Sequence, residues 1–135
     1  MKKLILVATP LFFIHALEEY LRGYYLTDSI FSILGEAMNI SPALAFILVQ
    51  VVLLLVLLAG VLFTHRLLLT LIGLIFAVEF SHVYVALRDF SFVPGFLTAL
   101  PLIFIGVLYW RQLLRTFFKQ GSAKNGSRYN GSYGS

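Results

Sequence analysis

Histidine and glutamate residues recur at short spacings inside two long apolar stretches of the sequence. The first group is His15-Ala-Leu-Glu18-Glu19, and the second is Glu79-Phe-Ser-His82. Residues three or four positions apart share one face of a helix, so each group would present imidazole and carboxylate side chains together. Imidazole nitrogen and carboxylate oxygen are suitable ligands for zinc, iron or manganese, and the same groups perform general acid–base catalysis.

The two groups are predicted to lie at the same depth in a membrane. Ionisable groups in hydrocarbon cost roughly 2.5–3.5 kcal/mol each on insertion scales, so they tend to mark sites or pathways. At 1.5 Å per residue, His15 and Glu79 lie ~3 Å from the middle of their helices toward the outer side. Glu18 and His82 lie ~7 Å from the middle toward the same side. We therefore expect one site in the outer half of the membrane.

Two chemical interpretations of this site stay open. In the first, a metal ion is bound by four ligands, which are His15, Glu18, Glu79 and His82. In the second, Glu18, Glu19 and His82 are catalytic and move protons without a metal, with Glu19 as a proton shuttle or outer partner. Gln50 and Thr98 lie at a similar depth on the other helices and are candidate pocket residues, although helix–helix hydrogen bonds would also explain them.

The elements that must position these residues are four apolar stretches long enough to cross about 30 Å of hydrocarbon. They are residues 4–24, 43–64, 67–87 and 92–110. The sequence thus predicts an all-α, polytopic membrane four-helix bundle, in which the first stretch is an uncleaved span and not a signal peptide. Residues 29–38 are expected to form a short interfacial helix between the first two spans, capped by Thr27, Asp28 or Ser29.

Composition agrees with a single membrane domain. The 135 residues are 60% hydrophobic with a mean hydropathy of +0.93, well above the value for soluble domains. Without cysteine, disulfides, iron–sulfur clusters and thiolate metal sites are excluded. We expect residues 1–118 to form the transmembrane domain and residues 119–135, rich in Gly, Ser and Asn, to form a disordered cytoplasmic tail.

Basic residues predict the orientation and disfavour a nucleic-acid partner, because they cluster near the ends of the spans. With a cytoplasmic amino terminus, eight would lie inside: Lys2, Lys3, Arg66, Arg111, Arg115, Lys119, Lys124 and Arg128. Arg22 and Arg88 would lie outside. Both termini are therefore expected in the cytoplasm.

The segment His15-Ala-Leu-Glu18-Glu19 resembles the defining motif of the HXXEE family of small bacterial integral membrane proteins. The later segment from His82 to Thr98, with Pro94-Gly95-Phe-Leu-Thr98, is similar to a second block of that family. The resemblance implies a bacterial inner-membrane location and the importance of His15, Glu18, Glu19 and His82. It also implies that Pro94, Gly95 and Thr98 shape the pocket rim. No activity is assigned to the family, so it does not supply a reaction.

Three functions are compatible with these residues. The first is a membrane enzyme with a metal-bound or acid–base site, acting on a lipid-like or apolar substrate that enters from the bilayer. The second is a proton, ion or small-molecule transport component, which in so short a chain would need a homo-oligomer. The third is a structural or accessory membrane protein whose polar pairs only fix helix packing. Because the polar residues stop near the middle of the membrane, the first interpretation is favoured.

Overall fold

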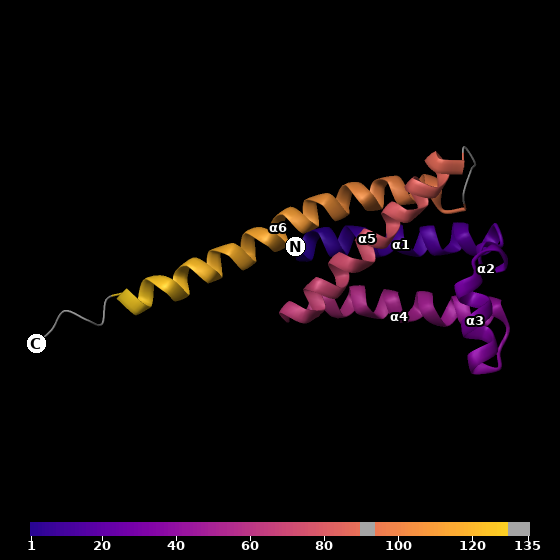
Figure 1. The fold of residues 1–135 in the computed structure, drawn as a ribbon, viewed down its shortest axis with the longest axis horizontal. Coiled ribbons are helices and arrows are strands. Elements are labelled where there is room, and N and C mark those ends of the chain that lie inside the picture. The colour runs from indigo at the N-terminus through magenta and orange to yellow at the C-terminus, as the bar shows by residue number, and fades with distance from the viewer. Residues whose placement is uncertain (90–93, 130–135) are drawn as a thin grey trace, which may run out of the picture.

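The structure is an all-α bundle of four long helices with two short helices at one end (Figure 1). This computed structural model describes residues 1–89 and 94–129. The long helices are α1 (Lys2–Leu21), α4 (Pro42–Leu62), α5 (Arg66–Asp89) and α6 (Phe96–Tyr129). The short helices are α2 (Tyr24–Thr27) and α3 (Ser29–Met38). The predicted four-helix bundle and its short helix between the first two spans are therefore confirmed.

The long helices form a closed ring. Helix α1 contacts α4 and α6, and α5 also contacts α4 and α6. Successive long helices alternate in direction, so the starts of α1 and α5 lie at one end of the bundle (Figure 1). The short helices α2 and α3 run across the other end, which we call the α3 end. The ring brings α1 and α5, the two helices that carry the histidines, around a common interior.

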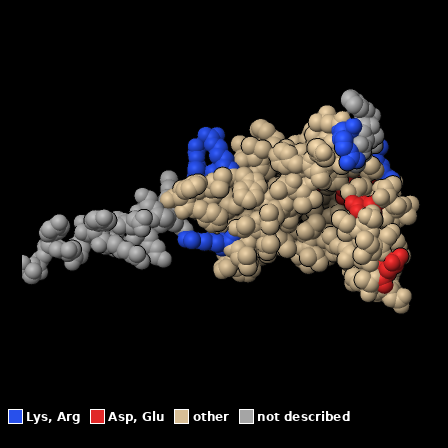
Figure 2. Space-filling model, in the orientation of Figure 1, with Lys and Arg blue, Asp and Glu red and all other residues tan. Residues whose placement is uncertain are grey.

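All four long helices are apolar and long enough to cross a membrane. The candidate spans are Lys2–Leu21, Pro42–Leu62, Arg66–Val85 and Phe96–Phe118, with mean hydropathy between 1.5 and 3.0. Only 22–33% of each span is buried inside the protein, so most of its apolar side chains face outward, as lipid contact requires. Figure 2 shows charged side chains near the two ends of the visible face and an uncharged band between them.

Local sequence signals explain where the helices begin and end. Helix α1 stops before Gly23, whose φ of +72° turns the chain into α2. The Asp28 carboxylate accepts a hydrogen bond from Ile30 N (2.9 Å) and caps α3, which selects one of the three predicted caps. Ser41 caps α4, and Pro42 occupies its first position, where the missing N–H costs nothing.

Helix α6 is longer than the predicted span over 92–110. Leu113 is fully buried and Phe117 packs against the core, so contacts with the bundle continue past Trp110. No proline follows Pro101, and the helix extends to Tyr129, into the segment 119–135 that the sequence predicts to be disordered. Residues 90–93, at the predicted start of the span, and residues 130–135 lie outside the described residues.

The interior of the bundle is apolar in one half and polar in the other. The core cluster away from the α3 end is apolar and includes Ile5, Ala8, Leu57, Ile72, Leu102 and Leu113. Tyr109 Oη donates to the Leu69 carbonyl (2.7 Å) and Trp110 Nε1 to the Gly73 carbonyl (2.9 Å), which ties α6 to α5. The polar half contains the buried ionisable side chains and lies toward the α3 end.

Candidate metal centre

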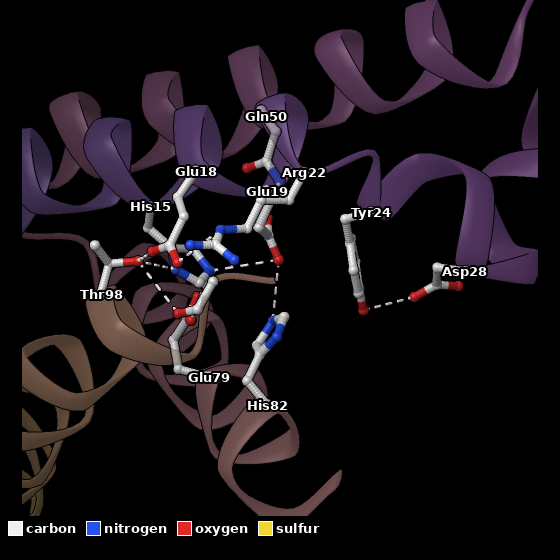
Figure 3. A network of polar contacts seen from close by, with 11 residues as sticks. His15, Glu18, Glu19, Arg22, Tyr24, Asp28, Gln50, Glu79, His82 and Thr98 are labelled. Atoms are coloured by element: carbon white, nitrogen blue, oxygen red, sulfur yellow. Dashed lines mark hydrogen bonds and ion pairs between the residues drawn. The ribbon is translucent and has the colours of Figure 1, made fainter. Parts of the chain in front are cut away.

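Four ionisable side chains are buried together between α1 and α5. His15 and Glu19 come from α1, and Glu79 and His82 come from α5; each is between 2% and 6% exposed. Figure 3 shows the two groups directed toward each other from the two helices. The structure therefore brings the imidazoles and carboxylates of the two sequence motifs to one place, as their spacing and depth predict.

The contacts connect each histidine of one helix to a carboxylate of the other. His15 Nε2 lies 3.0 Å from Glu79 Oε2, and His82 Nε2 lies 3.2 Å from Glu19 Oε1. Glu19 Oε1 is also 3.5 Å from His15 Nε2, so this one oxygen lies between the two imidazoles. Glu19 Oε2 accepts a hydrogen bond from Gln50 Nε2 of α4 at 3.2 Å, which fixes the carboxylate in this orientation.

Glu18, predicted as a metal ligand at the same depth as His82, does not face His82. Successive helical residues are rotated by about 100°, so Glu18 and Glu19 cannot both face α5. Glu19 takes that direction, while Glu18 faces α6 and Arg22, with Glu18 Oε1 3.6 Å from Arg22 Nε. The carboxylate between the histidines is therefore that of Glu19, which the sequence predicts as a catalytic proton shuttle or outer partner and not as a metal ligand.

Thr98 of α6 joins Glu18 to His15. Its hydroxyl donates to Glu18 Oε2 at 2.7 Å and lies 2.9 Å from His15 Nδ1; the Gly95 carbonyl is farther away, at 3.2 Å. A hydroxyl has one proton and an ionised carboxylate only accepts, so when Thr98 donates to Glu18, His15 donates to Thr98 through Nδ1. Nε2 is then the ring nitrogen that faces Glu19 and Glu79, and it would be the one available to a metal ion once it carries no proton.

His82 is oriented by the segment that precedes α6. The backbone of Pro94 lies within reach of its imidazole. Proline has no N–H, so in a hydrogen bond between them His82 donates and the carbonyl accepts. A backbone carbonyl that accepts from one ring nitrogen is the usual outer partner of a metal-binding histidine, and it leaves the second nitrogen for the ion.

Three of these side chains could hold a metal ion. His15, Glu19 and His82 each offer a ligand atom, and these atoms lie within 4.8 Å of one another. Around a tetrahedral zinc with bonds of 2.0–2.1 Å, ligand atoms lie about 3.3–3.4 Å apart. The 3.5 and 3.2 Å separations between Glu19 Oε1 and the two Nε2 atoms are close to this value. Glu79, which the sequence predicts as a ligand, is not one of these three residues. Its Oε2 atom lies 3.0 Å from His15 Nε2.

An apolar cavity adjoins the polar cluster. Its volume is about 510 Å³, and His15, Glu19, Gln50, Glu79 and His82 line its polar end. The rest of the wall comes mostly from aliphatic side chains: Leu34, Val49, Leu53, Val56, Leu71, Leu74, Ile75 and Val78. A cavity of this size with a few convergent polar groups is typical of a small-molecule site.

Three predicted pocket residues lie behind the histidines and not along this cavity. Gln50 is among the residues that line the cavity, whereas Pro94, Gly95 and Thr98 are not. Gly95 instead packs against the imidazole: a Cβ there would lie 2.6 Å from His15 Cε1 and 3.0 Å from Glu19 Cγ. Together with Pro94 and the bonds made by Thr98, this contact makes the segment a support for the two rings.

Tyr24 and Asp28 line the cavity although the sequence analysis did not propose them as site residues. The Tyr24 ring lies 5.4 Å from the His82 ring between centroids, and Tyr24 Oη donates to Asp28 Oδ2 at 2.8 Å. Burial and the bond to Asp28 raise the pKa of Tyr24, so its hydroxyl stays protonated. Their spacing of four residues was the available signal, because it predicts contact across one helical turn.

Comparison with known families gives one match. A model of the family described as "Protein of unknown function with HXXEE motif" matches residues 6–110. The match covers most of the chain and includes every residue of the polar cluster. Neither the curated proteins nor the solved structures gave a match.

Proposed function

The chain belongs to the HXXEE family, whose function is unknown, and we propose that it is a membrane-embedded enzyme acting on a lipid-like substrate. The observation that carries this proposal is the position of three potential ligand atoms, from His15, Glu19 and His82, at the polar end of an apolar cavity. The metal-bound form of the site is favoured by the ligand separations. Acid–base catalysis by the same residues is the second form of the proposal.

In the metal-bound form, His15, Glu19 and His82 are the ligands. Two imidazoles and one carboxylate bind zinc in hydrolytic enzymes and iron in oxygenases, and both arrangements leave positions open for water or substrate. Such an ion would activate a bound water or polarise a substrate oxygen. Glu79, beside His15 and on the cavity wall, is placed to accept a proton from a group in the cavity.

The metal is tested by its content in the purified full-length protein. We expect about one zinc, iron or manganese ion per chain, and loss of that ion in His82→Ala. The matched control is His65→Ala, because His65 is exposed between α4 and α5. Wild-type protein that retains no ion after loading with each metal would refute the metal-bound form.

Catalysis is tested by lipid mass spectrometry of membranes that contain wild-type protein or variants. A lipid species that is depleted by wild type and His65→Ala, but not by His15→Gln or Glu19→Gln, would identify the substrate. Identical lipid profiles for all four proteins would count against an enzyme and favour the structural alternative. In that case His15→Gln should also lower the thermal stability strongly, because the polar pairs would serve only to hold α1 against α5.

The transport alternative is less well supported by the contacts. A proton or ion path should continue through the half of the bundle away from the α3 end. Among the described residues that half is closed by the apolar core cluster, whose members are no more than 8% exposed. Thr9 and Thr70 are polar, but both donate to carbonyls of their own helices.

We further propose that the α3 end faces away from the cytoplasm. The described basic residues at the opposite end are Lys2, Lys3, Arg66, Arg111 and Arg115. An excess of lysine and arginine marks the cytoplasmic side, so both termini would be cytoplasmic. This orientation suits the bacterial inner membrane, and it places the polar cluster in the outer half.

A further inference from the structure

We propose that the cavity binds a single-chain lipid whose polar end donates hydrogen bonds and carries no negative charge, such as a long-chain alcohol or amine. This inference rests on the proposed function and names the substrate class of the same site. It follows from three properties of the cavity: the acceptors at its polar end, the sign of the charges there, and the place where it opens.

The polar end has an acceptor that lacks a donor. Gln50 Nε2 donates to Glu19 Oε2, which fixes the amide, since the reverse orientation would set two acceptors against each other. Gln50 Oε1 is then buried with no hydrogen-bond partner among the described residues. A buried acceptor without a partner is unfavourable. This oxygen is closed off from the cavity in the structure, so a ligand would satisfy it only by displacing the Gln50 side chain toward itself and donating a hydrogen bond. A hydroxyl or an ammonium can do so, whereas a carboxylate or a phosphate diester cannot.

The charges at the cavity favour the same class. Glu19, Asp28 and Glu79 are among its lining residues, and no lysine or arginine is among those described. A divalent ion would offset only two of these carboxylates. An anionic head group would therefore lack a cationic partner, whereas a neutral or cationic one would not be repelled.

The cavity opens toward lipid. Leu71, Leu74 and Val78 of α5 line it and are nevertheless 43%, 51% and 62% exposed. All three lie within the candidate span Arg66–Val85, so this side of the cavity would face the hydrocarbon. Ile30 of α3 also lines the cavity and is 58% exposed at the α3 end. A volume of about 510 Å³ suits one hydrocarbon chain better than the two chains of a phospholipid.

The head-group specificity is tested by competition binding to the full-length protein in phosphatidylcholine nanodiscs. The probe is a fluorescent sixteen-carbon alcohol, and the competitors are 1-hexadecanol, hexadecylamine, palmitate and hexadecyl phosphate. We expect the alcohol and the amine to displace the probe at least tenfold more effectively than palmitate or hexadecyl phosphate. Equal displacement by all four, preference for either anion, or no displacement by alcohol and amine would overturn the proposal.

Two pairs of variants connect the binding to this cavity. Gln50→Leu removes the unpaired acceptor and should reduce the preference for the alcohol about tenfold. Val78→Trp should block the opening and abolish probe binding, whereas Val107→Trp should not. Val107 is a matched control because it is 52% exposed on α6 and does not line the cavity. Retained binding in Val78→Trp would place the ligand elsewhere and contradict the proposal.

These binding measurements require no turnover, and metal content is measured separately on the same preparations. A protein that binds metal but does not distinguish the head groups would refute the substrate class and leave the proposed centre standing. A protein that selects the alcohol but holds no metal would refute the metal-bound form and leave the substrate class standing.

Discussion

At the scale of single residues, one hydroxyl decides which nitrogen of His15 faces the centre. Thr98 Oγ1 donates to Glu18 and accepts from His15 Nδ1, so the three side chains form a chain that ends at the proposed ion. Glu18 thus acts on His15 through Thr98, although it lies outside the ligand group. Glu18 and Thr98 are positioning residues in this account.

The first prediction concerns this hydroxyl. Thr98→Val keeps the side-chain shape but removes both hydrogen bonds, and loss of an outer partner of this kind typically lowers metal affinity by about 10–100-fold. It should also cost about 1–3 kcal/mol of unfolding free energy, because Glu18 loses a donor. A competitive metal titration measures the affinity, and Thr98→Ser should restore it. Unchanged affinity in Thr98→Val would show that the chain of bonds does not orient His15.

The second prediction concerns the glycine behind the ring. Gly95 has a φ of +83°, and a Cβ there would lie 2.6 Å from His15 Cε1. We expect Gly95→Ala to displace the imidazole and to lower metal binding at least tenfold. Gly23→Ala is the control, since Gly23 also has a positive φ, +72°, but its nearest neighbour would be 3.6 Å away. If both variants lose metal affinity to the same extent, backbone strain and not the contact with His15 causes the loss. If Gly95→Ala keeps the wild-type metal affinity, the prediction is wrong.

The residue types of the site could be predicted from the sequence, but their pairing could not. Spacing and depth correctly brought His15 and Glu79 together, because both depend only on helical rise. The choice between Glu18 and Glu19 depends on how α1 is rotated about its axis. That rotation is set by packing against α4 and α6, which no local pattern in α1 reveals.

At the scale of the elements, α2 and α3 connect the cavity to the α3 end of the bundle. Tyr24 and Phe31 lie on its wall, and α3 packs mainly on α4. Asp28 connects α2 to α3, because its carboxylate caps α3 and also accepts a hydrogen bond from Tyr24. The sequence predicted the helix and its candidate caps, but not its contribution to the cavity wall.

The third prediction tests this connection. Asp28→Ala removes the cap and the partner of Tyr24, so α3 should lose about 0.5–2 kcal/mol of local stability. Hydrogen exchange of the first amides of α3 should become faster, while those of α4 stay unchanged. Ser41→Ala, which removes the cap of α4, should give the opposite pattern. Unaltered exchange of α3 in Asp28→Ala would mean that packing on α4 alone holds this helix.

The length of α6 shows why the end of an element is harder to predict than its existence. A hydropathy pattern predicted a span ending at Trp110, because Arg111 and Arg115 follow it. Leu113 is nevertheless buried between those arginines, since a helix that continues past the bilayer can still pack on the amino-terminal end of its neighbours. The apolar contact was visible only once α6 was placed beside α5.

At the scale of the whole molecule, the bundle separates an apolar half from a polar half with a lateral opening. The fourth prediction concerns its orientation. The chain has no cysteine, so single cysteines can be introduced without background. Lys2→Cys and Arg115→Cys should react with a membrane-impermeant reagent only after the membrane is opened, whereas Glu36→Cys should react in intact cells. The reverse pattern would place the polar cluster in the cytoplasmic half.

The claim on which this account depends is that His15, Glu19 and His82 share one ion. Anomalous X-ray scattering from crystals of the zinc-loaded, full-length protein tests it most directly. The account predicts one peak about 2.0–2.2 Å from His15 Nε2, a Glu19 carboxylate oxygen and His82 Nε2. An anomalous map without a peak among these three side chains, in protein shown to have been exposed to saturating zinc, would contradict it.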